Sequence, residues 1–354
     1  MSEINFPLVR KQLLCWYRDN KRDLPWRQSS DPYAIWLAET MLQQTQVKTA
    51  LPYYAKFLAT FPSIEALARA PLQRILRLWS GLGYYRRAEN LKKGARQIVR
   101  NHGGRMPDDY AQLRGLAGIG DYTAGAILSI AFQKSYPAID GNVRRVFARL
   151  FTVTDEKLVR ATADRLVPQI QPGDFNQALM ELGATICTPK KPRCSVCPVK
   201  GECASQQANP AEAVTSHRQR RKVHNVLWPL AIVYRNRKIL LRRRAADGLL
   251  AGLWELPGLQ LARGENLRHF RQYLEQQLPL KLAQPRRIGA IRHTITNRRI
   301  RAPIYVFEAD GDSARTSLRG HWRWIAPAGV EKQPISSMTA KAVKIFAAYE
   351  KNLH

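Results

Sequence analysis

Acidic residues are scarce in this sequence. Asp and Glu number 27 against 57 Lys and Arg, which gives a formal net charge of +30 over 354 residues. Such an excess opposes folding through self-repulsion unless a polyanion offsets it. Nucleic acid is the natural partner of this kind, because its phosphates neutralise a basic surface. An anionic membrane surface is the alternative partner.

Long hydrophobic runs are also absent. No uninterrupted apolar stretch reaches the roughly 18 residues that a membrane-spanning helix needs. The start of the sequence does not resemble a signal peptide. We therefore expect a cytoplasmic, nucleoid-associated monomer with no membrane partner. Hydrophobic residues still make up 45% of the chain, which predicts folded domains, and the length suits two of them.

Cysteine is rare, and four of the five cysteines lie close together. Cys15 stands alone in an apolar stretch and is expected to be a buried thiol. The others are spaced C-x6-C-x2-C-x5-C, which, without an export signal, indicates metal ligands rather than disulfides. Zinc and an iron–sulfur cluster are both open, and the single C-x2-C pair favours the cluster. The predicted ligands are Cys187, Cys194, Cys197 and Cys203.

The chain changes character near residue 205. Residues 6 to about 204 show apolar positions at three- and four-residue spacing, punctuated by proline and glycine, which predicts successive helices and no strands. A polar stretch follows and predicts a basic linker over residues 209–225 that can also touch phosphate. The predicted domains are therefore a helical one over 1–208 and a second one over 226–354.

The second domain is predicted to be α+β. Segments 226–228, 230–234 and 238–241 are typical of paired strands around a turn at 235–237. Later strands are expected at 303–307 and 322–325, and helices near 265–278 and 337–350. The fold class is thus multidomain, mainly α at first and α+β after the linker.

Residues 113–124 predict a helix, a tight glycine turn and a second helix. Gly118 and Gly120 let the backbone approach a ligand closely, and the second helix begins with exposed N–H groups that suit a DNA phosphate. An ordinary corner between two helices explains the same composition equally well.

Two carboxylates are candidates for chemistry. Glu39 lies among Trp36, Met41 and Leu42, whose apolar side chains would raise its pKa and let it act as an acid. A solvated helix face is the more common setting of a lone Glu. Asp140 precedes a helical segment, so helix capping explains it without a catalytic role.

Several motifs, taken in order, resemble one protein family. They are LPWR at 24–27, ETMLQQTQV at 39–47, GLGYY at 81–85, the glycine turn, DGNV at 140–143 and FNQALM at 175–180, followed by the four cysteines. This order closely resembles the MutY family of adenine DNA glycosylases, within the helix-hairpin-helix superfamily. The resemblance covers nearly the whole chain and is densest up to Cys203. It implies a [4Fe-4S] cluster and a Nudix-like C-terminal domain.

The resemblance implies roles in base removal. Glu39 would protonate the departing adenine, and Asp140 would stabilise the cationic sugar, electrostatically or through a transient covalent bond. Tyr122 and Asn142 would support them. Two carboxylates, one protonated and one ionised, meet these needs, as in glycoside hydrolysis.

The resemblance also implies how DNA is held. Its partner would be double-stranded DNA containing adenine opposite 8-oxoguanine or guanine, and the adenine must be flipped out of the stack to be reached. Gln44 and Tyr84 would wedge into the space that it leaves. Other base and DNA contacts would come from Leu24, Trp26, Arg27, Thr45, Gly118, Gly120, Gln177 and Met180.

The related endonuclease III-type glycosylase/lyases cut the strand and need a lysine amine for a Schiff base. That lysine lies in their glycine turn, where this chain has Tyr122, and no lysine occurs from residue 94 to 133. The comparison predicts a monofunctional glycosylase. A non-catalytic DNA-binding iron–sulfur protein is another alternative, and the presence of both Glu39 and Asp140 argues against it.

Residues 252–258 resemble part of a Nudix domain. A nucleotide phosphohydrolase needs clustered glutamates on a helix to bind magnesium, whereas the glutamates at 264–275 are scattered among basic groups. We therefore expect lesion recognition instead. The family's lesion loop ends in Phe-Ser-His, and here RHT at 292–294 leads into ITN at 295–297. Thr296 keeps a hydroxyl for 8-oxoguanine and Asn297 keeps hydrogen bonding. An ordinary polar hairpin tip is the alternative.

Overall fold

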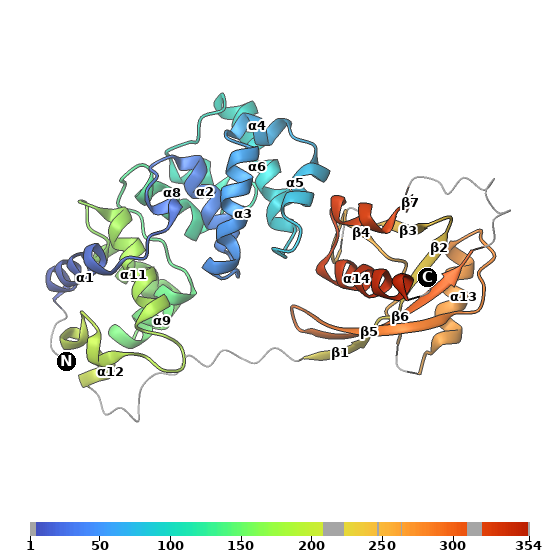
Figure 1. Cartoon of the computed structure of the whole chain (residues 1–354). Coiled ribbons are helices and arrows are strands. Elements are labelled where there is room, and N and C mark those ends of the chain that lie inside the picture. Colours follow the sequence, from blue (N-terminus) through green and yellow to red (C-terminus); the bar gives the residue numbers. More distant parts are fainter. Residues whose placement is uncertain (1–4, 208–222, 246–247, 263, 310–320, 353–354) are drawn as a thin grey trace. The chain divides into compact units, whose positions relative to one another are not determined.

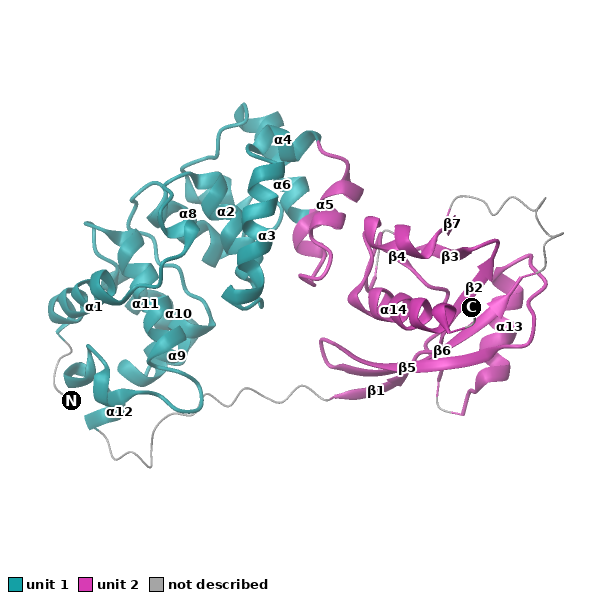
Figure 2. Cartoon of the chain, viewed as in Figure 1, with its two compact units in different colours: residues 1–69, 90–218 teal, residues 70–89, 219–354 magenta. Residues whose placement is uncertain are grey.

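The computed structural model describes residues 5–207, 223–245, 248–262, 264–309 and 321–352. Contacts divide the chain into two compact units, residues 1–69 with 90–218 and residues 70–89 with 219–354 (Figure 2). Residues 209–222 of the predicted linker lie outside the described residues, and the domain boundaries at 208 and 226 stay predictions. None of the described helices combines the length and apolarity that crossing a membrane requires.

The described chain up to residue 207 is helical, as the sequence predicts (Figure 1). The α-helices are α1 (Phe6–Asn20), α2 (Pro32–Leu42), α3 (Val47–Thr60), α4 (Ile64–Arg69), α5 (Leu72–Leu78), α6 (Arg86–His102), α7 (Tyr110–Arg114), α8 (Asp121–Ile130), α9 (Gly141–Leu150), α10 (Glu156–Leu166), α11 (Pro172–Thr185) and α12 (Ala204–Gln207). Short 3-10 helices are η1 (Pro25–Arg27), η2 (Cys194–Val196) and η3 (Lys200–Glu202).

Helices α1, α9, α10 and α11 share one hydrophobic core. Val9, Leu13 and Tyr17 of α1 enter it at four-residue spacing, which puts them on one face of the helix. Cys15 lies off this face and is exposed. The prediction of a buried Cys15 thiol is therefore wrong, because an apolar run in a helix covers both the inner and the outer face.

Helix α2 is enclosed on all sides. Every residue from Tyr33 to Met41 is buried, as expected for a helix that is apolar around its whole circumference. Its N-terminus is capped by the Asp31 side chain, which accepts a hydrogen bond from the Tyr33 amide at 3.0 Å. This helix carries Glu39 into the interior.

The second unit is built on a seven-stranded mixed sheet. Its strands are β1 (His224–Leu227), β2 (Leu230–Arg235), β3 (Lys238–Arg243), β4 (Trp254–Glu255), β5 (Arg286–Ile295), β6 (Arg298–Glu308) and β7 (Trp322–Ile325). Helices α13 (Leu267–Gln277) and α14 (Ser337–Lys351), with the 3-10 helix η6 (Pro327–Lys332), complete the unit. Ile232 packs in the core cluster with α14 and Val233 in the cluster with α13, so the two helices cover opposite faces of the sheet.

The strand pairing departs from the sequence prediction at one end. β2 and β3 pair antiparallel, as predicted, but β1 pairs in parallel with residues 298–301 of β6. β2 pairs with residues 304–308 further along β6, while β5 takes the other edge of that strand. Pro229, which has no N–H to donate, lies between β1 and β2 and lets them run one after the other along β6. β4 and β5 were not predicted.

Residues 70–89 belong to the second unit and contact two loops beside its sheet. Gln73 Nε2 donates to the Gly252 carbonyl at 3.2 Å. The hydroxyls of Ser80 and Tyr85 both donate to the carbonyl of Ile335, at 2.7 and 3.2 Å. The GLGYY motif therefore belongs, by its contacts, to the unit that contains the sheet.

Candidate active site

Glu39 is a buried acid of the helical unit. Its side chain projects from the middle of α2, and the residue is 5% exposed. The Tyr122 hydroxyl, from the first turn of α8, donates a short hydrogen bond to Glu39 Oε2. The prediction of an apolar setting for Glu39 is thus confirmed, and the solvated-face alternative is wrong.

Burial raises the pKa of Glu39 to about 7 from its ordinary 4.5. The Tyr122 hydrogen bond opposes this rise, the charge of Asp140 adds to it, and Arg27 opposes it. Burial is the largest cause, because a carboxylate removed from water loses its solvation. A substantial fraction of Glu39 is therefore protonated at neutral pH, as an acid catalyst requires.

Asp140 is the N-cap of α9, as its sequence context predicts. Its Oδ1 accepts from the amides of Asn142 and Val143 at 2.8 and 2.7 Å, and its Oδ2 accepts from Asn142 Nδ2 at 2.9 Å. Burial raises the pKa of Asp140, and these three hydrogen bonds and the Arg145 charge pull it back down. The two carboxylates thus differ, because Asp140 has three donors and Glu39 has one.

A fully buried amide holds the segment that leads to Asp140. Asn176 of α11 is 1% exposed. Its Oδ1 accepts from the Ala138 amide at 3.1 Å, and its Nδ2 donates to the Tyr136 carbonyl at 2.8 Å and to Ser129 Oγ at 2.9 Å. All of its hydrogen-bonding capacity but one acceptor lone pair is used. Asn176 lies in the matched FNQALM motif, but nothing in the sequence distinguishes it from the other motif residues as a positioning group.

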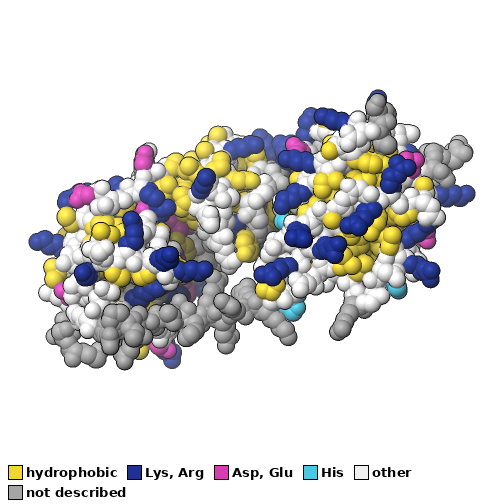
Figure 3. All heavy atoms as spheres, turned by 60° about the horizontal axis from the view of Figure 1, so that its bottom comes forward, with side chains coloured by type: hydrophobic (Ala, Val, Ile, Leu, Met, Phe, Trp, Pro, Cys, Tyr) yellow, Lys and Arg dark blue, Asp and Glu magenta, His cyan; other side chains and the backbone are white. Residues whose placement is uncertain are grey.

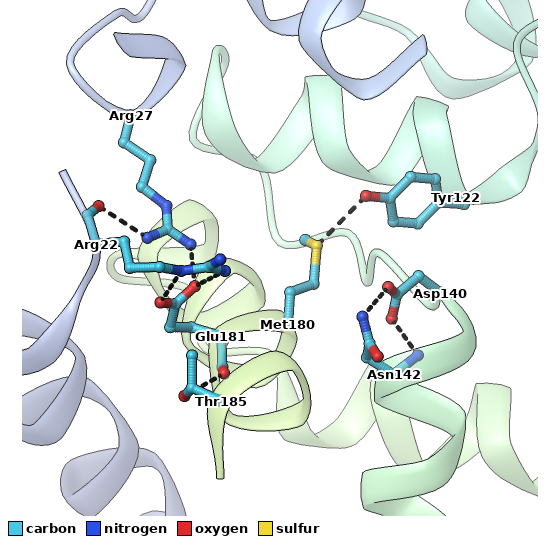
Figure 4. A network of polar contacts seen from close by, with 8 residues as sticks. All are labelled: Arg22, Arg27, Tyr122, Asp140, Asn142, Met180, Glu181 and Thr185. Carbon is cyan, nitrogen blue, oxygen red and sulfur yellow. Dashed lines mark hydrogen bonds and ion pairs between the residues drawn. The ribbon is translucent and has the colours of Figure 1, made fainter. Parts of the chain in front are cut away.

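A network of charges borders the site, and the sequence did not reveal it (Figure 4). Glu181 of α11 is 1% exposed and accepts from Arg22 Nε and Nη2, at 2.6 and 2.7 Å, and from Arg27 Nη2 at 2.6 Å. These bonds hold the pKa of Glu181 below its ordinary value despite burial. Arg27 Nη1 also donates to the Arg22 carbonyl at 3.0 Å. The network fastens the segment before α2 to α11.

The predicted base-pocket residues lie around this network. Leu24 and Trp26 flank Pro25 at η1 and are buried, and Trp26 meets the Tyr54 ring edge-on at 5.3 Å. Gln177 and Met180 are half-buried on α11. Met180 Sδ accepts from the Tyr122 hydroxyl at 3.3 Å, which brings α11 next to the partner of Glu39 (Figure 4).

Three of the predicted DNA-contact residues have left-handed backbones. Gln44 has φ 57° in the turn between α2 and α3, Tyr84 has φ 47°, and Thr296 has φ 53° at the β5–β6 hairpin tip. Positive φ is uncommon for non-glycine residues and is a genuine outlier for β-branched Thr. Such conformations cost on the order of 1–3 kcal/mol each and gather at functional positions. Tyr84 is also 45% exposed, although it is aromatic.

The glycine turn has the predicted helix–turn–helix form. α7 ends at Arg114 and α8 begins at Asp121. Gly118 has φ 83°, and a Cβ there would lie 2.8 Å from the Asn90 Cβ, so glycine is required. Gly120 is the N-cap of α8 and supplies no side-chain bond to the helix amides. Phosphate binding by this turn and by Thr45 stays a prediction.

The four clustered cysteines are all free thiols. Cys187, Cys197 and Cys203 pack against the core shared by α1, α9, α10 and α11. Cys197 lies close enough to interact electrostatically with the other three cysteines, so all four lie near one another. Among the described residues, no three His, Cys, Asp or Glu side chains are placed to hold a single metal ion. Four closely spaced cysteines suit an iron–sulfur cluster, which Cys thiolates would hold.

Two arginines of α9 connect this loop to the carboxylate site. Arg145 Nη2 donates to Asn142 Oδ1 at 2.8 Å, and Arg145 Nε donates to the Cys187 carbonyl at 2.8 Å. Arg149, one turn later, donates to the Cys187 sulfur at 3.4 Å and to the Thr188 carbonyl at 2.8 Å. Neither arginine was predicted, although their four-residue spacing puts both on one face of the helix.

The Nudix-like part of the second unit lacks an acidic metal site among its described residues. Glu255, in the motif at 252–258, is paired with Arg242 at 2.9 Å and with Arg244 at 2.8 Å. A carboxylate neutralised by two guanidinium groups is a poor magnesium ligand. Lesion recognition by this domain stays a prediction.

Family comparisons agree with this fold. The HhH-GPD superfamily base excision DNA repair protein family matches residues 37–169, the NUDIX domain matches residues 230–344, and the iron-sulfur binding domain of endonuclease III matches residues 187–203. The protein is thus a DNA glycosylase of the helix-hairpin-helix superfamily, and it carries a [4Fe-4S] cluster. This confirms the predicted fold class and the choice of cluster over zinc.

Individual relatives narrow the family. The adenine DNA glycosylase of Homo sapiens is 34% identical and covers 95% of this chain and 73% of its own length. The adenine DNA glycosylase of Mus musculus is 35% identical and covers 96% of this chain and 78% of its own length. The adenine DNA glycosylase of Buchnera aphidicola subsp. Baizongia pistaciae is 39% identical and covers 69% of this chain and 72% of its own length. The chain belongs to the adenine DNA glycosylase family.

Solved structures match the helical unit. A thermostable thymine-DNA glycosylase has a TM-score of 0.54 at 31% identity and covers 57% of this chain and 96% of its own. Endonuclease III in a non-covalent DNA complex has a TM-score of 0.51 at 20% identity, covers 58% of this chain and 98% of its own, and shares the fold.

Proposed function

We propose that this protein hydrolyses the N-glycosidic bond of adenine paired with 8-oxoguanine or guanine in duplex DNA, as a step of base excision repair. The observation that carries the proposal is the pair of unlike carboxylates, Glu39 in an apolar setting and Asp140 held by three donors. The family membership supports adenine as the base.

The chemistry divides between the two acids. Adenine leaves slowly unless it is protonated, and Glu39, with its pKa raised to about 7, can supply the proton near neutral pH. The sugar that remains develops positive charge, which the Asp140 carboxylate stabilises electrostatically or through a transient covalent bond before water attacks. Tyr122 orients Glu39, and Asn142 orients Asp140.

DNA binding brings the adenine to these acids. The base must leave the stack, which costs a few kcal/mol. Gln44 and Tyr84 are proposed to fill the space, and the turn at Gly118 and Gly120 to bind a backbone phosphate. The four cysteines would hold the cluster and so fold the basic loop between them, which is proposed to contact DNA and to take no part in bond cleavage. Tyr122 stands in place of a Schiff-base lysine, so the product is an intact strand with an abasic site.

The deciding experiment is a single-turnover assay with excess protein on labelled duplexes. We expect adenine release opposite 8-oxoguanine and opposite guanine, strand breakage only after alkali, and no efficient borohydride-trapped protein–DNA adduct. Absence of adenine release from these duplexes would refute the function. Trapping at the rate of base release would refute the monofunctional mechanism alone.

Tyr122→Phe should move the pH dependence of adenine release to higher pH. In the wild type, the hydrogen bond from Tyr122 lowers the pKa of Glu39. Removing this bond should therefore raise that pKa above 7. The rate of adenine release falls as Glu39 ionises. In Tyr122→Phe this fall should begin at a pH about one unit higher than in the wild type. Single-turnover rates from pH 5.5 to 9 measure the shift.

The control for this variant is Tyr33→Phe. The Tyr33 hydroxyl donates to the Phe61 carbonyl at 2.8 Å and contacts neither carboxylate. Its pH profile should match the wild type. A Tyr122→Phe profile that moves to lower pH would contradict the assigned role.

Glu181→Gln should slow adenine release at saturating protein roughly 10- to 100-fold, because small misplacements of positioning groups have effects of this size. The neutral amide cannot anchor two guanidinium groups, so the segment that carries Leu24 and Trp26 is no longer fastened to α11. Glu181→Asp keeps the charge and should recover part of the rate.

The control for this variant is Glu156→Gln, which removes the exposed partner of Arg144. Exposed pairs contribute little, so its rate should stay within about twofold of the wild type. Equal rates for the Glu181 and Glu156 variants would remove Glu181 from the site.

Thr296→Ala should reduce adenine release opposite 8-oxoguanine much more than opposite guanine. 8-Oxoguanine gains an N7–H donor and an O8 acceptor, and a hydroxyl can pair with either. The Thr296 hydroxyl donates to the Ile295 carbonyl at 2.7 Å in the described structure, so it must turn outward to do this. Equal losses on both duplexes, or none, would place lesion recognition elsewhere.

A further inference from the structure

Arg87 differs from the other arginines of this strongly basic chain. Figure 3 shows Lys and Arg side chains spread over the surface of one face of the molecule. Of the arginines in the described ranges, only Arg87 is buried, and 9% of it is exposed. It lies in the first turn of α6, and its amide donates to the Tyr84 carbonyl at 2.9 Å. The buried arginine thus closely follows the aromatic residue that is proposed to enter the base stack.

The Arg87 guanidinium contacts two aromatic rings. Its Cζ lies over the Trp79 ring, 5.4 Å from the ring centre, and over the Tyr84 ring, 5.5 Å from the ring centre. Both distances suit a cation–π attraction, which is stronger where water is excluded. Burial lowers the pKa of Arg87 to about 10, so the guanidinium stays charged at neutral pH. Trp79 is fully buried and Tyr84 is 45% exposed, so the cation connects an exposed ring to a buried one.

The same guanidinium holds the turn that carries Tyr84. Gly81, Gly83 and Tyr84 have positive φ angles of 99°, 77° and 47°. The Gly83 carbonyl accepts from Arg87 Nη2 at 3.2 Å and from Trp79 Nε1 at 3.0 Å. A non-glycine residue keeps a left-handed backbone only where the surrounding structure holds it. Two side-chain donors on the preceding carbonyl supply such a hold.

A side chain that enters the base stack acts best when its orientation is fixed before DNA binds. Ordering a side chain at an interface costs free energy, which reduces what the inserted ring returns for the lost stacking. We infer that Arg87 is a positioning residue for base removal, whose guanidinium holds the Tyr84 ring and backbone ready to fill the space that the adenine leaves. This inference rests on the proposed function, in which Tyr84 is the wedge, and it gives Arg87 no contact with DNA.

The test is a double-mutant cycle on single-turnover release of adenine opposite 8-oxoguanine, with protein in excess. Arg87→Met keeps an unbranched side chain but removes the charge and the donors. It should slow release roughly 5- to 30-fold in the wild type and in Tyr84→Phe, because both keep the ring. In Tyr84→Ala no ring remains to be held, so the same change should alter the rate by less than about twofold. Arg87→Lys keeps the charge and should recover part of the rate.

The matched control is Arg235→Met. Arg235 of β2 lies over the Trp324 ring at 4.8 Å in the same unit, so this change removes an equal charge from another ring and leaves the Tyr84 contact in place. Its rate should stay within about twofold of the wild type. The slope of log K against log salt for duplex binding should be the same in Arg87→Met as in the wild type, because no phosphate contact is lost.

Three results would overturn the inference. Equal slowing by Arg87→Met in the wild type and in Tyr84→Ala would show that Arg87 supports the fold rather than the ring. A salt slope lowered by about 1 would make Arg87 a phosphate ligand. A wild-type rate in Arg87→Met or in Tyr84→Ala would remove the contact from base removal. If Arg87→Met does not fold, the smaller loss in Arg87→Lys should likewise vanish in Tyr84→Ala. Absence of adenine release by the wild type would refute the proposed function, whereas release with independent effects of the two residues would refute this inference alone.

Discussion

Glu39→Gln should bind the substrate duplex as the wild type does and release adenine at least 10²- to 10⁴-fold more slowly. This is the usual contribution of a general acid, and an amide has no proton to give at any accessible pH. The change is nearly isosteric, and the Tyr122 hydroxyl can still donate to the amide oxygen. Single-turnover rates and equilibrium binding on the same duplex separate the two effects.

The same variant should be more stable than the wild type at high pH. The folded pKa of Glu39 is about 7 and the ordinary value is 4.5, so the buried carboxylate costs stability above pH 7. Its replacement should add up to about 3 kcal/mol there, and the gain should shrink as the pH falls and vanish below about 4.5. Normal base release, or a stability difference with the opposite pH trend, would contradict the assignment.

Asp140→Asn should keep the fold and lose most of the activity. The amide oxygen can still cap α9 through the Asn142 and Val143 amides, so the cap changes by only tenths of a kcal/mol to about 1 kcal/mol. The amide nitrogen then faces Asn142 Nδ2, a donor meeting a donor. If the Asn142 amide rotates to avoid this, its Nδ2 faces Arg145 Nη2 instead, which donates to Asn142 Oδ1 in the wild type.

The expected loss of rate for Asp140→Asn is about 10²- to 10³-fold, the size found when one electrostatic stabiliser of a transition state is removed. Asp140→Ser is the matched control, because serine caps a helix well and carries no charge. Both variants should unfold within a few degrees of the wild type and be similarly slow. Wild-type rates of adenine release in either variant would show that Asp140 only caps α9.

The helical unit and its carboxylates were predictable because they depend on local pattern. Spacing of apolar residues predicts helices, and the neighbours of Glu39 in sequence already suggest an apolar setting. Glu181 and Asn176 could not be singled out in this way. Glu181 binds Arg22 from a position 159 residues away, and Asn176 binds residues up to 47 positions away. Such partners are brought together only by packing.

The strands of the second unit show a different limit. β5 and the first four residues of β6 each carry three arginines, so these segments lack the apolar character by which strands were sought, whereas the apolar part of β6 at 303–307 was predicted. β1 was predicted as a strand, but its parallel partner lies more than 70 residues later and no local turn specifies it. The left-handed backbone of Thr296 was likewise not predictable, because its sequence does not contain the usual glycine.

The contacts of residues 70–89 constrain which sequence changes the molecule can accept. The acceptors on the sheet-containing unit are the main-chain carbonyls of Gly252 and Ile335, while the donors are the side chains of Gln73, Ser80 and Tyr85. The Ile335 side chain is buried in the core of this unit, so only apolar side chains of similar size would leave its carbonyl in place. An insertion or deletion nearby would instead shift the backbone and break the docking. Position 335 should therefore accept only conservative apolar substitutions, and the length of its loop should stay constant.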